Sequence, residues 1–322
     1  MTLSSAATAR PSSAASAVRR SNPRMSLPLA KPKSQPNRST SSAPVEETIR
    51  AAWLLKAVLI TLAAALFCVY ASLCLLFYQG QWQLILHPSH LIAATPAAQG
   101  LKFEDVHFDV TETGVSQLDG WWIPADPGSR WSSSAILYLH DGAGSLSDAL
   151  PTLAMLHDLG VNVFAFDYRG FGRSVSVRPG EQTMQADAQA AWNYLTQTRS
   201  LSAQSVVLYG TGLGATPATQ LAAATSPAGI ILDTPSETAR TLFLRDSRSH
   251  ILPLWLLQNQ NFDPEPVLRA LAIPKLFLDR DGERPRTRQL FHAAAYPRTY
   301  VEARSQIDTT HALQQFFDQV LH

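Results

Sequence analysis

Ten residues in the middle of the chain combine a strand pattern with a glycine turn: Val206-Val207-Leu208-Tyr209-Gly210-Thr211-Gly212-Leu213-Gly214-Ala215. The first four are β-branched, apolar or aromatic, as in a buried strand. The glycines predict a tight turn with close backbone approach, and the alanine-rich stretch 213–225 predicts a helix. Pro217 fits this helix because it falls in the first turn. The sequence therefore predicts a strand, a turn and a helix in direct succession.

Strand-like apolar runs alternate with helix-length segments on both sides of this turn. They cover residues 134–140, 161–167, 205–210, 228–233, 273–279 and 298–303. Such spacing indicates βαβ units and a mostly parallel sheet. Two earlier runs, 103–110 and 118–123, are expected to pair antiparallel. Met184, Ala188 and Trp192 recur at helical spacing between strands. We predict an α/β domain with a mostly parallel, eight-stranded sheet flanked by helices.

An apolar segment precedes this domain. Residues 57–78 contain no charged side chain, and a helix of that length, at ~1.5 Å per residue, crosses the ~30 Å hydrocarbon core of a bilayer. A buried core helix would be shorter and show a polar face. A cleaved signal peptide is the harder alternative, but its apolar run would be shorter. We predict one transmembrane helix within residues 53–79, which anchors the chain in a membrane through residues 57–78.

Charge is divided unevenly about the apolar segment. The net charge of +1 over 322 residues argues against a nucleic-acid partner. Residues 1–52 nevertheless hold eight basic and two acidic side chains, whereas the rest holds 18 basic and 23 acidic ones. The first stretch is rich in Ser, Ala, Pro and Arg, which is typical of a disordered arm. The positive-inside rule places this arm in the cytoplasm and residues 80–322 in a periplasmic or other extracytoplasmic compartment.

The composition indicates neither a metal nor a cofactor. Both cysteines, Cys68 and Cys74, lie inside the predicted span, so the domain has no disulfide framework and no thiolate metal site. His87 and His90 form a His-x-x-His pair without a third ligand nearby in the sequence. The glycine turn does not match the dinucleotide-binding fingerprint. We therefore expect no metal and no cofactor.

Two loops elsewhere in the chain extend the pattern of the glycine turn. They read Leu137-Tyr138-Leu139-His140-Asp141-Gly142-Ala143-Gly144 and Phe166-Asp167-Tyr168-Arg169-Gly170-Phe171-Gly172-Arg173-Ser174. With the turn in the strand-to-helix context of a nucleophile elbow, the chain from about Gln81 onward resembles the α/β-hydrolase superfamily. It is most similar to the membrane-anchored branch of serine-aminopeptidase-like and acyl-hydrolase-like proteins. The resemblance implies an α/β-hydrolase fold and a small acyl, lipid or peptide ligand.

Members of this superfamily carry serine at the centre of the elbow, where this chain has Gly212. Glycine has no side chain to acylate. Thr211 is not an obvious substitute, because side chains next to the elbow centre are expected to point away from the cleft. Glycine also relieves a strained backbone with φ > 0, worth ~1–3 kcal/mol. We expect Gly212→Ser to restore some reactivity toward serine probes if the remaining machinery is intact.

The resemblance also assigns the other members of the catalytic triad. The base corresponds to His311, expected after the last strand and before the C-terminal helix. The orienting acid follows the strand 273–279, where Asp279, Asp281 and Glu283 compete. We choose Asp281. Together these residues predict a degenerate triad that lacks its nucleophile.

An oxyanion hole would use the backbone N–H groups of Gly142 and Leu213. Relatives usually read His-Gly-Asn-Ala-Gly in the first loop, whereas this chain carries a carboxylate at Asp141. If this side chain points inward it repels a developing oxyanion; if it points to solvent it has little consequence.

Residues 236–266 are irregular and contain one apolar stretch, Ile251-Leu252-Pro253-Leu254-Trp255-Leu256-Leu257. This segment is either a cap over a cleft or a helix packed on the core, and the core is the favoured interpretation. Trp121 and Trp122 are likewise expected to pack in the core.

Two functions compete. The first is a membrane-anchored pseudo-hydrolase with a binding or regulatory role, because Gly212 leaves no nucleophile. The alternative is an active hydrolase of acyl esters, amides or lipids that uses a non-standard nucleophile or a water activated by His311. Covalent labelling by a serine-directed probe would distinguish them.

Overall fold

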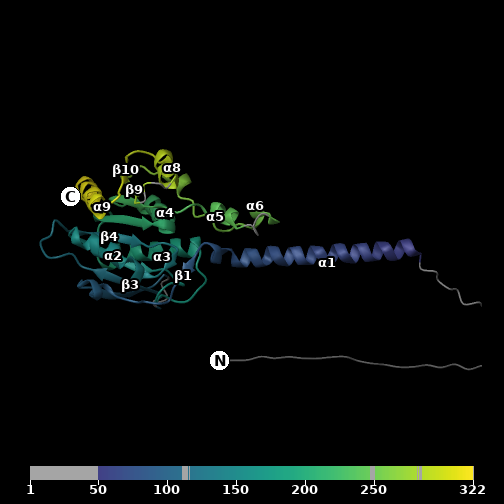
Figure 1. Cartoon of the computed structure of the whole chain (residues 1–322). Helices are drawn as coiled ribbons and strands as arrows, with labels where there is room; N and C mark the ends of the chain where they lie inside the picture. Colours follow the sequence, from purple (N-terminus) through teal and green to yellow (C-terminus); the bar gives the residue numbers. More distant parts are fainter. Residues whose placement is uncertain are drawn as a thin grey trace, which may run out of the picture. The chain divides into compact units, whose positions relative to one another are not determined.

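The computed structural model describes residues 50–110, 115, 117–246, 251–280, 282 and 285–321. Most of the predicted basic arm lies outside these residues. Contacts divide the chain into Met1–Ala57 and Val58–His322, and the α/β domain belongs to the second unit. The helices (Figure 1) are α1 (Ala51–Gly80), α2 (Leu146–Asp158), α3 (Glu181–Asn193), α4 (Ala215–Thr225), α5 (Ala239–Arg245), α6 (Leu254–Leu257), α7 (Glu265–Leu268), α8 (Pro285–Ala293) and α9 (Gln306–Val320). Short turns of 3-10 or π helix are η1 (Gln81–Leu84), η2 (Pro96–Gln99), η3 (Tyr194–Thr198), η4 (Ala203–Ser205) and η5 (Gly212–Gly214).

The sheet has eight strands in the order β10-β9-β8-β7-β4-β6-β3-β2. They are β2 (Glu104–Phe108), β3 (Leu118–Ile123), β4 (Trp131–Leu139), β6 (Val161–Asp167), β7 (Val206–Thr211), β8 (Gly229–Asp233), β9 (Lys275–Asp279) and β10 (Arg298–Glu302). The pairings of β2 with β3 and of β3 with β6 are antiparallel, and all others in this sheet are parallel. The predicted α/β class, the mostly parallel sheet and the early antiparallel pair are confirmed. A separate two-stranded ladder joins β1 (His87–Pro88) to β5 (Ala143–Gly144).

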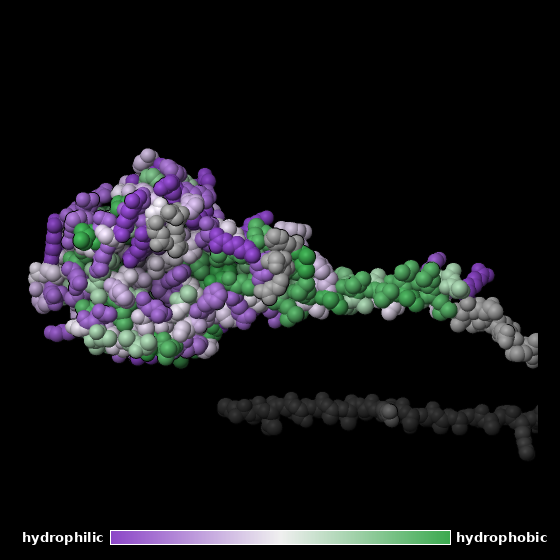
Figure 2. All heavy atoms as spheres, viewed as in Figure 1, coloured by the Kyte–Doolittle hydropathy of each residue, from purple (hydrophilic) through white to green (hydrophobic). Residues whose placement is uncertain are grey.

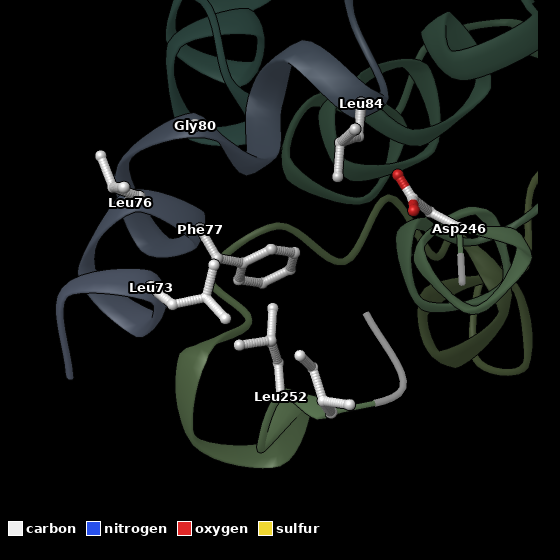
Figure 3. Close-up of a pocket in the computed structure, with 8 residues that line it drawn as sticks. Leu73, Leu76, Phe77, Gly80, Leu84, Asp246 and Leu252 are labelled. Atoms are coloured by element: carbon white, nitrogen blue, oxygen red, sulfur yellow. The ribbon is translucent and has the colours of Figure 1, made fainter. Parts of the chain in front are cut away.

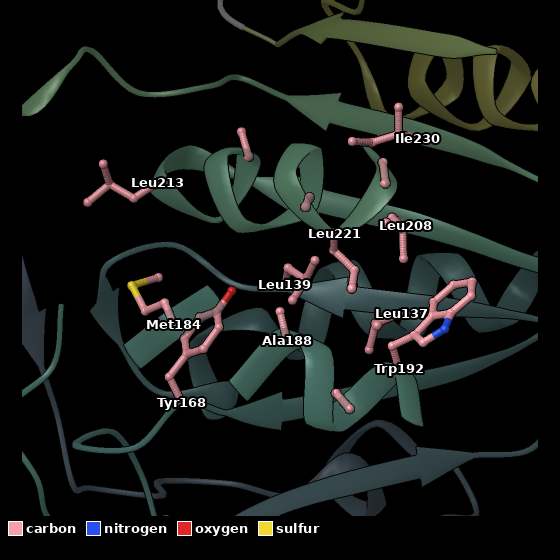
Figure 4. Close-up of a cluster of buried hydrophobic side chains, with 14 of the residues drawn as sticks. Leu137, Leu139, Tyr168, Met184, Ala188, Trp192, Leu208, Leu213, Leu221 and Ile230 are labelled. Carbon is pink, nitrogen blue, oxygen red and sulfur yellow. The ribbon is translucent and has the colours of Figure 1, made fainter. Parts of the chain in front are cut away.

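Successive residues of the central strands contribute to different layers of the core, as the period of two along a strand requires. Leu137 and Leu139 of β4 pack in the cluster that contains buried side chains of α3 and α4, which Figure 4 shows. Ile136 and Tyr138 pack in the cluster formed with α2 and α9. Because both faces are covered, the strands read as continuous apolar runs.

The predicted core positions on α3 and β3 are confirmed. Met184 and Ala188 are fully buried and Trp192 nearly so. Trp121 and Trp122 alternate between the two clusters on β3.

Helix α1 is long and apolar enough to cross a membrane, and within the described part of the chain it is the one helix that is. None of its apolar window is buried, whereas a core helix of a soluble protein would be mostly covered. Figure 2 shows the hydrophobic side chains along the helix. Near its end, the ring of Phe77 packs edge-on against Phe243, with centroids 5.4 Å apart. The last turns of α1 therefore contact the domain at Phe77.

The interpretation of residues 236–266 as a helix packed on the core is confirmed for α5, whose Ala239 and Phe243 are fully buried, but it does not hold for most of residues 251–257. In this fully described stretch Leu254 alone is buried, while Trp255 is 81% exposed and Leu256 65%. The stretch lies beside the end of α1, because the Gln81 side-chain amide donates a hydrogen bond to the Leu257 carbonyl over 3.0 Å. An apolar pattern alone does not distinguish a side chain buried in its own domain from one that faces another apolar medium.

Candidate functional site

The turn after β7 brings strand and helix closer together than side chains would allow. Gly212 has φ +56°, a left-handed conformation that favours glycine. A Cβ atom on Gly210 would lie 2.8 Å from the Cα of Ala215, and one on Gly214 would overlap the carbonyl oxygen of Leu139. The expectation that the flanking glycines permit close approach of strand and helix is confirmed.

The carboxylate of Asp141 points into this turn. Its Oδ1 accepts hydrogen bonds from the backbone N–H groups of Gly142 and Leu213, each over 2.7 Å. A Cβ atom on Gly212 would overlap both Cγ and Oδ1 of this carboxylate. Asp141 therefore adopts the inward of the two orientations considered above. The two N–H groups predicted for an oxyanion hole share one acceptor, and that acceptor is a side chain of the protein itself.

A polar cavity of about 280 Å³ opens beside Gly212. It is lined by Asp141, Thr152, Thr211, Gly212, Asp233, Thr234, Ser236 and Arg280. The cavity lies at the carboxyl ends of β7 and β8, where ligands of α/β sheets usually bind. Thr211, whose side chain is expected to point away from the cleft, is among the lining residues. The Thr234 hydroxyl donates to Asp233 Oδ1 over 2.9 Å.

Arg280 lines one side of the cavity and forms an ion pair with the buried Asp233 carboxylate. Its Nε donates to Asp233 Oδ1 over 3.0 Å, and a terminal nitrogen lies 2.6 Å from Asp233 Oδ2. The same nitrogen donates to the Tyr209 hydroxyl, which donates in turn to Asp233 Oδ2 over 2.6 Å. Burial and the Asp233 carboxylate raise the pKa of Tyr209, so its hydroxyl remains a donor. The register that pairs Thr211 with Asp233 brings these strand ends together.

Of the triad residues inferred from the resemblance, those that the structure describes do not line this cavity. His311 is exposed on α9 and is not among the lining residues. It was expected before the C-terminal helix, but α9 begins at Gln306 because the side chain of Ser305 caps it, accepting from the Asp308 N–H. Asp281 and Glu283 lie outside the described residues. Asp279 is buried and accepts from the Tyr300 hydroxyl over 2.9 Å, away from the lining.

The described residues include no cluster of three His, Cys, Asp or Glu side chains suited to a metal ion. The ring of His90 donates from Nδ1 to the carbonyl of Gly172 over 3.1 Å. His87 is exposed on β1.

His140, which precedes Asp141 in the chain, and Asp167 form a second pair of titratable side chains. The His140 ring donates from Nδ1 to the Asp141 carbonyl over 2.6 Å, and its Nε2 lies 3.9 Å from Asp167 Oδ1. Burial lowers the pKa of His140 to about 4, and burial raises the pKa of Asp167 to about 7. The backbone N–H of Leu146 donates to Asp167 Oδ1 over 2.9 Å. His140 is therefore neutral at pH 7, and Asp167 titrates near pH 7.

Replacing Asp167 by asparagine is expected to stabilise the protein at high pH. Because the folded-state pKa of Asp167 exceeds the unfolded value, the folded state binds the extra proton, and this stability is lost as pH rises through about 7. Asp167→Asn keeps an acceptor for Leu146 without the charge. We expect the free energy of unfolding of this variant to exceed that of wild type by about 1–3 kcal/mol at pH 8 and to match it near pH 4. Urea unfolding of the full chain in detergent measures this. The exposed Asp158→Asn serves as control, and a pH-independent gap would contradict the assignment.

The sheet order, the glycine turn after β7 and the cavity at the strand ends together define an α/β-hydrolase type of domain. The chain belongs to the Alpha/beta hydrolase family, whose sequence model matches residues 136–320.

Curated relatives share part of the chain. An uncharacterized protein of Mycobacterium tuberculosis, MT2364, is 36% identical over 125 residues, which are 39% of this chain and 43% of that protein. The alpha/beta hydrolase domain-containing protein 17C of Xenopus tropicalis is 31% identical over 139 residues, 43% of each chain. The matches thus span less than half of these relatives.

Solved structures share the fold over a larger part of the chain. The Pyrococcus furiosus esterase Pf2001 aligns with a TM-score of 0.59 at 18% identity, covering 74% of this chain and 99% of that one. An alpha-beta hydrolase from Vibrio vulnificus aligns with a TM-score of 0.54 at 21% identity, covering 70% and 82%. At these identities the likeness is one of fold.

Proposed function

We propose that this protein is a membrane-anchored α/β hydrolase that binds or regulates and does not transfer acyl groups. The observation that carries the proposal is the position of the Asp141 carboxylate. It accepts hydrogen bonds from the N–H groups of Gly142 and Leu213, beside a glycine at the elbow centre. Gly212 stands where a serine hydrolase of this family would carry its nucleophile.

Acyl transfer needs a nucleophile and donors aimed at the oxyanion that develops. Gly212 supplies no nucleophile. The two N–H groups already bind a fixed carboxylate, so a substrate oxyanion would have to displace Asp141 and meet its negative charge. Loss of a single oxyanion donor costs about 10²–10³ in rate in a serine hydrolase. Here both donors are engaged at once, which favours a non-catalytic role.

Within the described residues, the cavity also offers no free base for the alternative, an active hydrolase with another nucleophile. No histidine occurs among the described lining residues. Thr211, Thr234 and Ser236 are among the lining residues. The Thr234 hydroxyl donates to the Asp233 carboxylate, which is held in turn by Arg280. A water activated by His311 has no support, since that side chain is exposed on α9. These contacts favour binding over catalysis.

A fluorophosphonate probe tests this proposal. The full chain in detergent is incubated with the probe beside an active serine hydrolase as positive control, and modified residues are mapped by mass spectrometry. We expect no label on the cavity residues and no ester hydrolysis above that of heat-denatured protein. A label on Thr211, Thr234 or Ser236 would establish the alternative function instead.

Anchoring is the second part of the proposal. The exposed apolar surface of α1 supports a membrane span, and its contacts with the domain through Phe77 favour a retained helix over a cleaved leader. The basic residues before the helix favour the domain on the opposite side of the membrane from the arm. Protease accessibility of the domain in sealed vesicles reports this orientation.

A further inference from the structure

An apolar pocket of about 300 Å³ lies between the last turns of α1 and the segment after α5 (Figure 3). Its lining consists of Leu73, Leu76, Phe77, Gly80, Leu84, Asp246, Ile251 and Leu252. Apart from Asp246 and the glycine, every described lining residue is hydrophobic. The pocket is separate from the polar cavity at Gly212, with which it shares no lining residue.

Side chains beside this pocket form an exposed apolar surface, which we call the 251–257 lip. Ile251 is 62% exposed, and Trp255 and Leu256 are exposed as well. The hydroxyl of Tyr70 donates to the Ile251 carbonyl over 3.1 Å. The lip therefore begins at the level of Tyr70, ten residues before α1 ends, and adjoins the exposed apolar side chains of the helix.

The length of α1 places this lip at a bilayer boundary. The helix has 30 residues and is therefore about 45 Å long, whereas the hydrocarbon core of a bilayer is about 30 Å thick. The predicted span of residues 57–78 is itself about 33 Å long, so the last turns of α1 reach the outer edge of the core. The lip contacts Tyr70 at Ile251 and Gln81 at Leu257, and it therefore extends from that edge toward the core. Trp and Tyr side chains are enriched at that depth, and the lip presents Trp255.

We propose that the 251–257 lip inserts into the membrane interface and that the pocket between the lip and α1 holds an alkyl chain of a bilayer lipid. The inference rests on the proposed anchoring by α1. It does not depend on whether the cavity at Gly212 is catalytic.

A lipid chain fits the pocket because the apolar lining continues into the exposed apolar surface of α1. Leu73, Leu76 and Phe77 come from α1 itself, so a chain that packs along the helix can enter without crossing polar surface. The carboxylate of Asp246 is the polar group at the pocket, as Figure 3 shows.

The test uses the full chain reconstituted in phosphatidylcholine vesicles that contain a phospholipid with a diazirine on its acyl chain. After irradiation, crosslinked residues are mapped by mass spectrometry. We expect crosslinks along α1, on the 251–257 lip and on the pocket residues Leu252 and Leu84. Crosslinks on α1 without any on the lip or the pocket would overturn this inference and leave the anchor standing. Vesicle-bound protein with no crosslink on α1 would overturn both.

A substitution inside the pocket separates chain binding from general proximity to lipid. Gly80 is part of the pocket wall, and the nearest neighbour of a Cβ atom on it is Gln83 Oε1 at 3.9 Å, so Gly80→Met adds a long side chain at the wall without a clash. We expect it to lower crosslinking at Leu252 several-fold and to leave that at Trp255 unchanged. Leu91→Met, at an exposed leucine of the domain, is the matched control. Unchanged crosslinking at Leu252 in Gly80→Met would mean that the pocket holds no chain.

Discussion

Gly212→Ser alone is expected to lower the free energy of unfolding by about 2–4 kcal/mol and to leave the protein unlabelled by a fluorophosphonate. A serine at φ +56° adopts a strained backbone, which costs about 1–3 kcal/mol. Its Cβ atom would also overlap the Asp141 carboxylate. That carboxylate must then move and lose its bonds from Gly142 and Leu213, which are stronger than neutral hydrogen bonds.

Removing the carboxylate is expected to change the outcome of the same substitution. Asp141→Gly alone leaves two N–H groups without their acceptor, at a cost of about 1–3 kcal/mol. In Asp141→Gly/Gly212→Ser the serine has room, and the destabilisation should fall below the sum of the single effects by about 1–3 kcal/mol. Slow fluorophosphonate labelling of the new serine should also appear, because donors alone support about 10³–10⁴-fold catalysis over water when a triad is incomplete.

Alanine at the same position is the matched control for this cycle. Gly212→Ala, with and without Asp141→Gly, should repeat the stability pattern but take no label, since it carries no hydroxyl. Strictly additive unfolding energies would mean that Asp141 does not occupy the space beside Gly212. Equal labelling of Gly212→Ser and of the double variant would mean that the carboxylate does not obstruct the donors.

The sequence patterns were sufficient to predict the strands of the sheet. The runs that became β4, β6, β7 and β8 are apolar and regularly spaced, and a strand buried on both faces leaves such a signal regardless of its neighbours. Packing on the core holds for α5 but not for most of the lip at residues 251–257, because an apolar pattern carries no information about which surface covers it. That information lies in the contacts of Tyr70 and Gln81 with the lip, more than 170 residues apart in sequence.

The site was predictable only where backbone geometry determines it. The N–H groups of Gly142 and Leu213 were named together from sequence, and both point at one atom; their role as an oxyanion hole stays a prediction. The direction of the Asp141 side chain depends on a rotamer that no pattern reports. His311 was misplaced relative to α9 because an N-cap at Ser305 starts that helix earlier than expected.

The Arg280 network was not anticipated from the sequence. Asp233 and Tyr209 lie 24 residues apart along the chain and come together through the register of β7 with β8. A signal was nevertheless present, since polar residues at the carboxyl ends of neighbouring parallel strands meet at one edge of the sheet. Asp233 and Arg280 both follow that rule, at the ends of β8 and β9.

Arg280→Ala is expected to destabilise the domain by about 3–5 kcal/mol, because it leaves a buried charge without its partner. The Asp233 carboxylate is 4% exposed and, within the described part of the chain, would keep the hydroxyls of Tyr209 and Thr234 as its side-chain donors. Replacing both charges, in Arg280→Met/Asp233→Asn, should recover most of the loss, since neutral side chains need no counter-charge.

Unfolding of the full chain by urea in detergent measures these differences, and a surface pair provides the control. Arg304 is 79% exposed and paired with Glu302, so Arg304→Ala should cost no more than about 0.5 kcal/mol, as exposed ion pairs do. A loss in Arg280→Ala as small as that would show that water reaches Asp233 and replaces the guanidinium. If the double variant were no more stable than Arg280→Ala, the loss would reflect packing of the arginine stem and not the unpaired carboxylate.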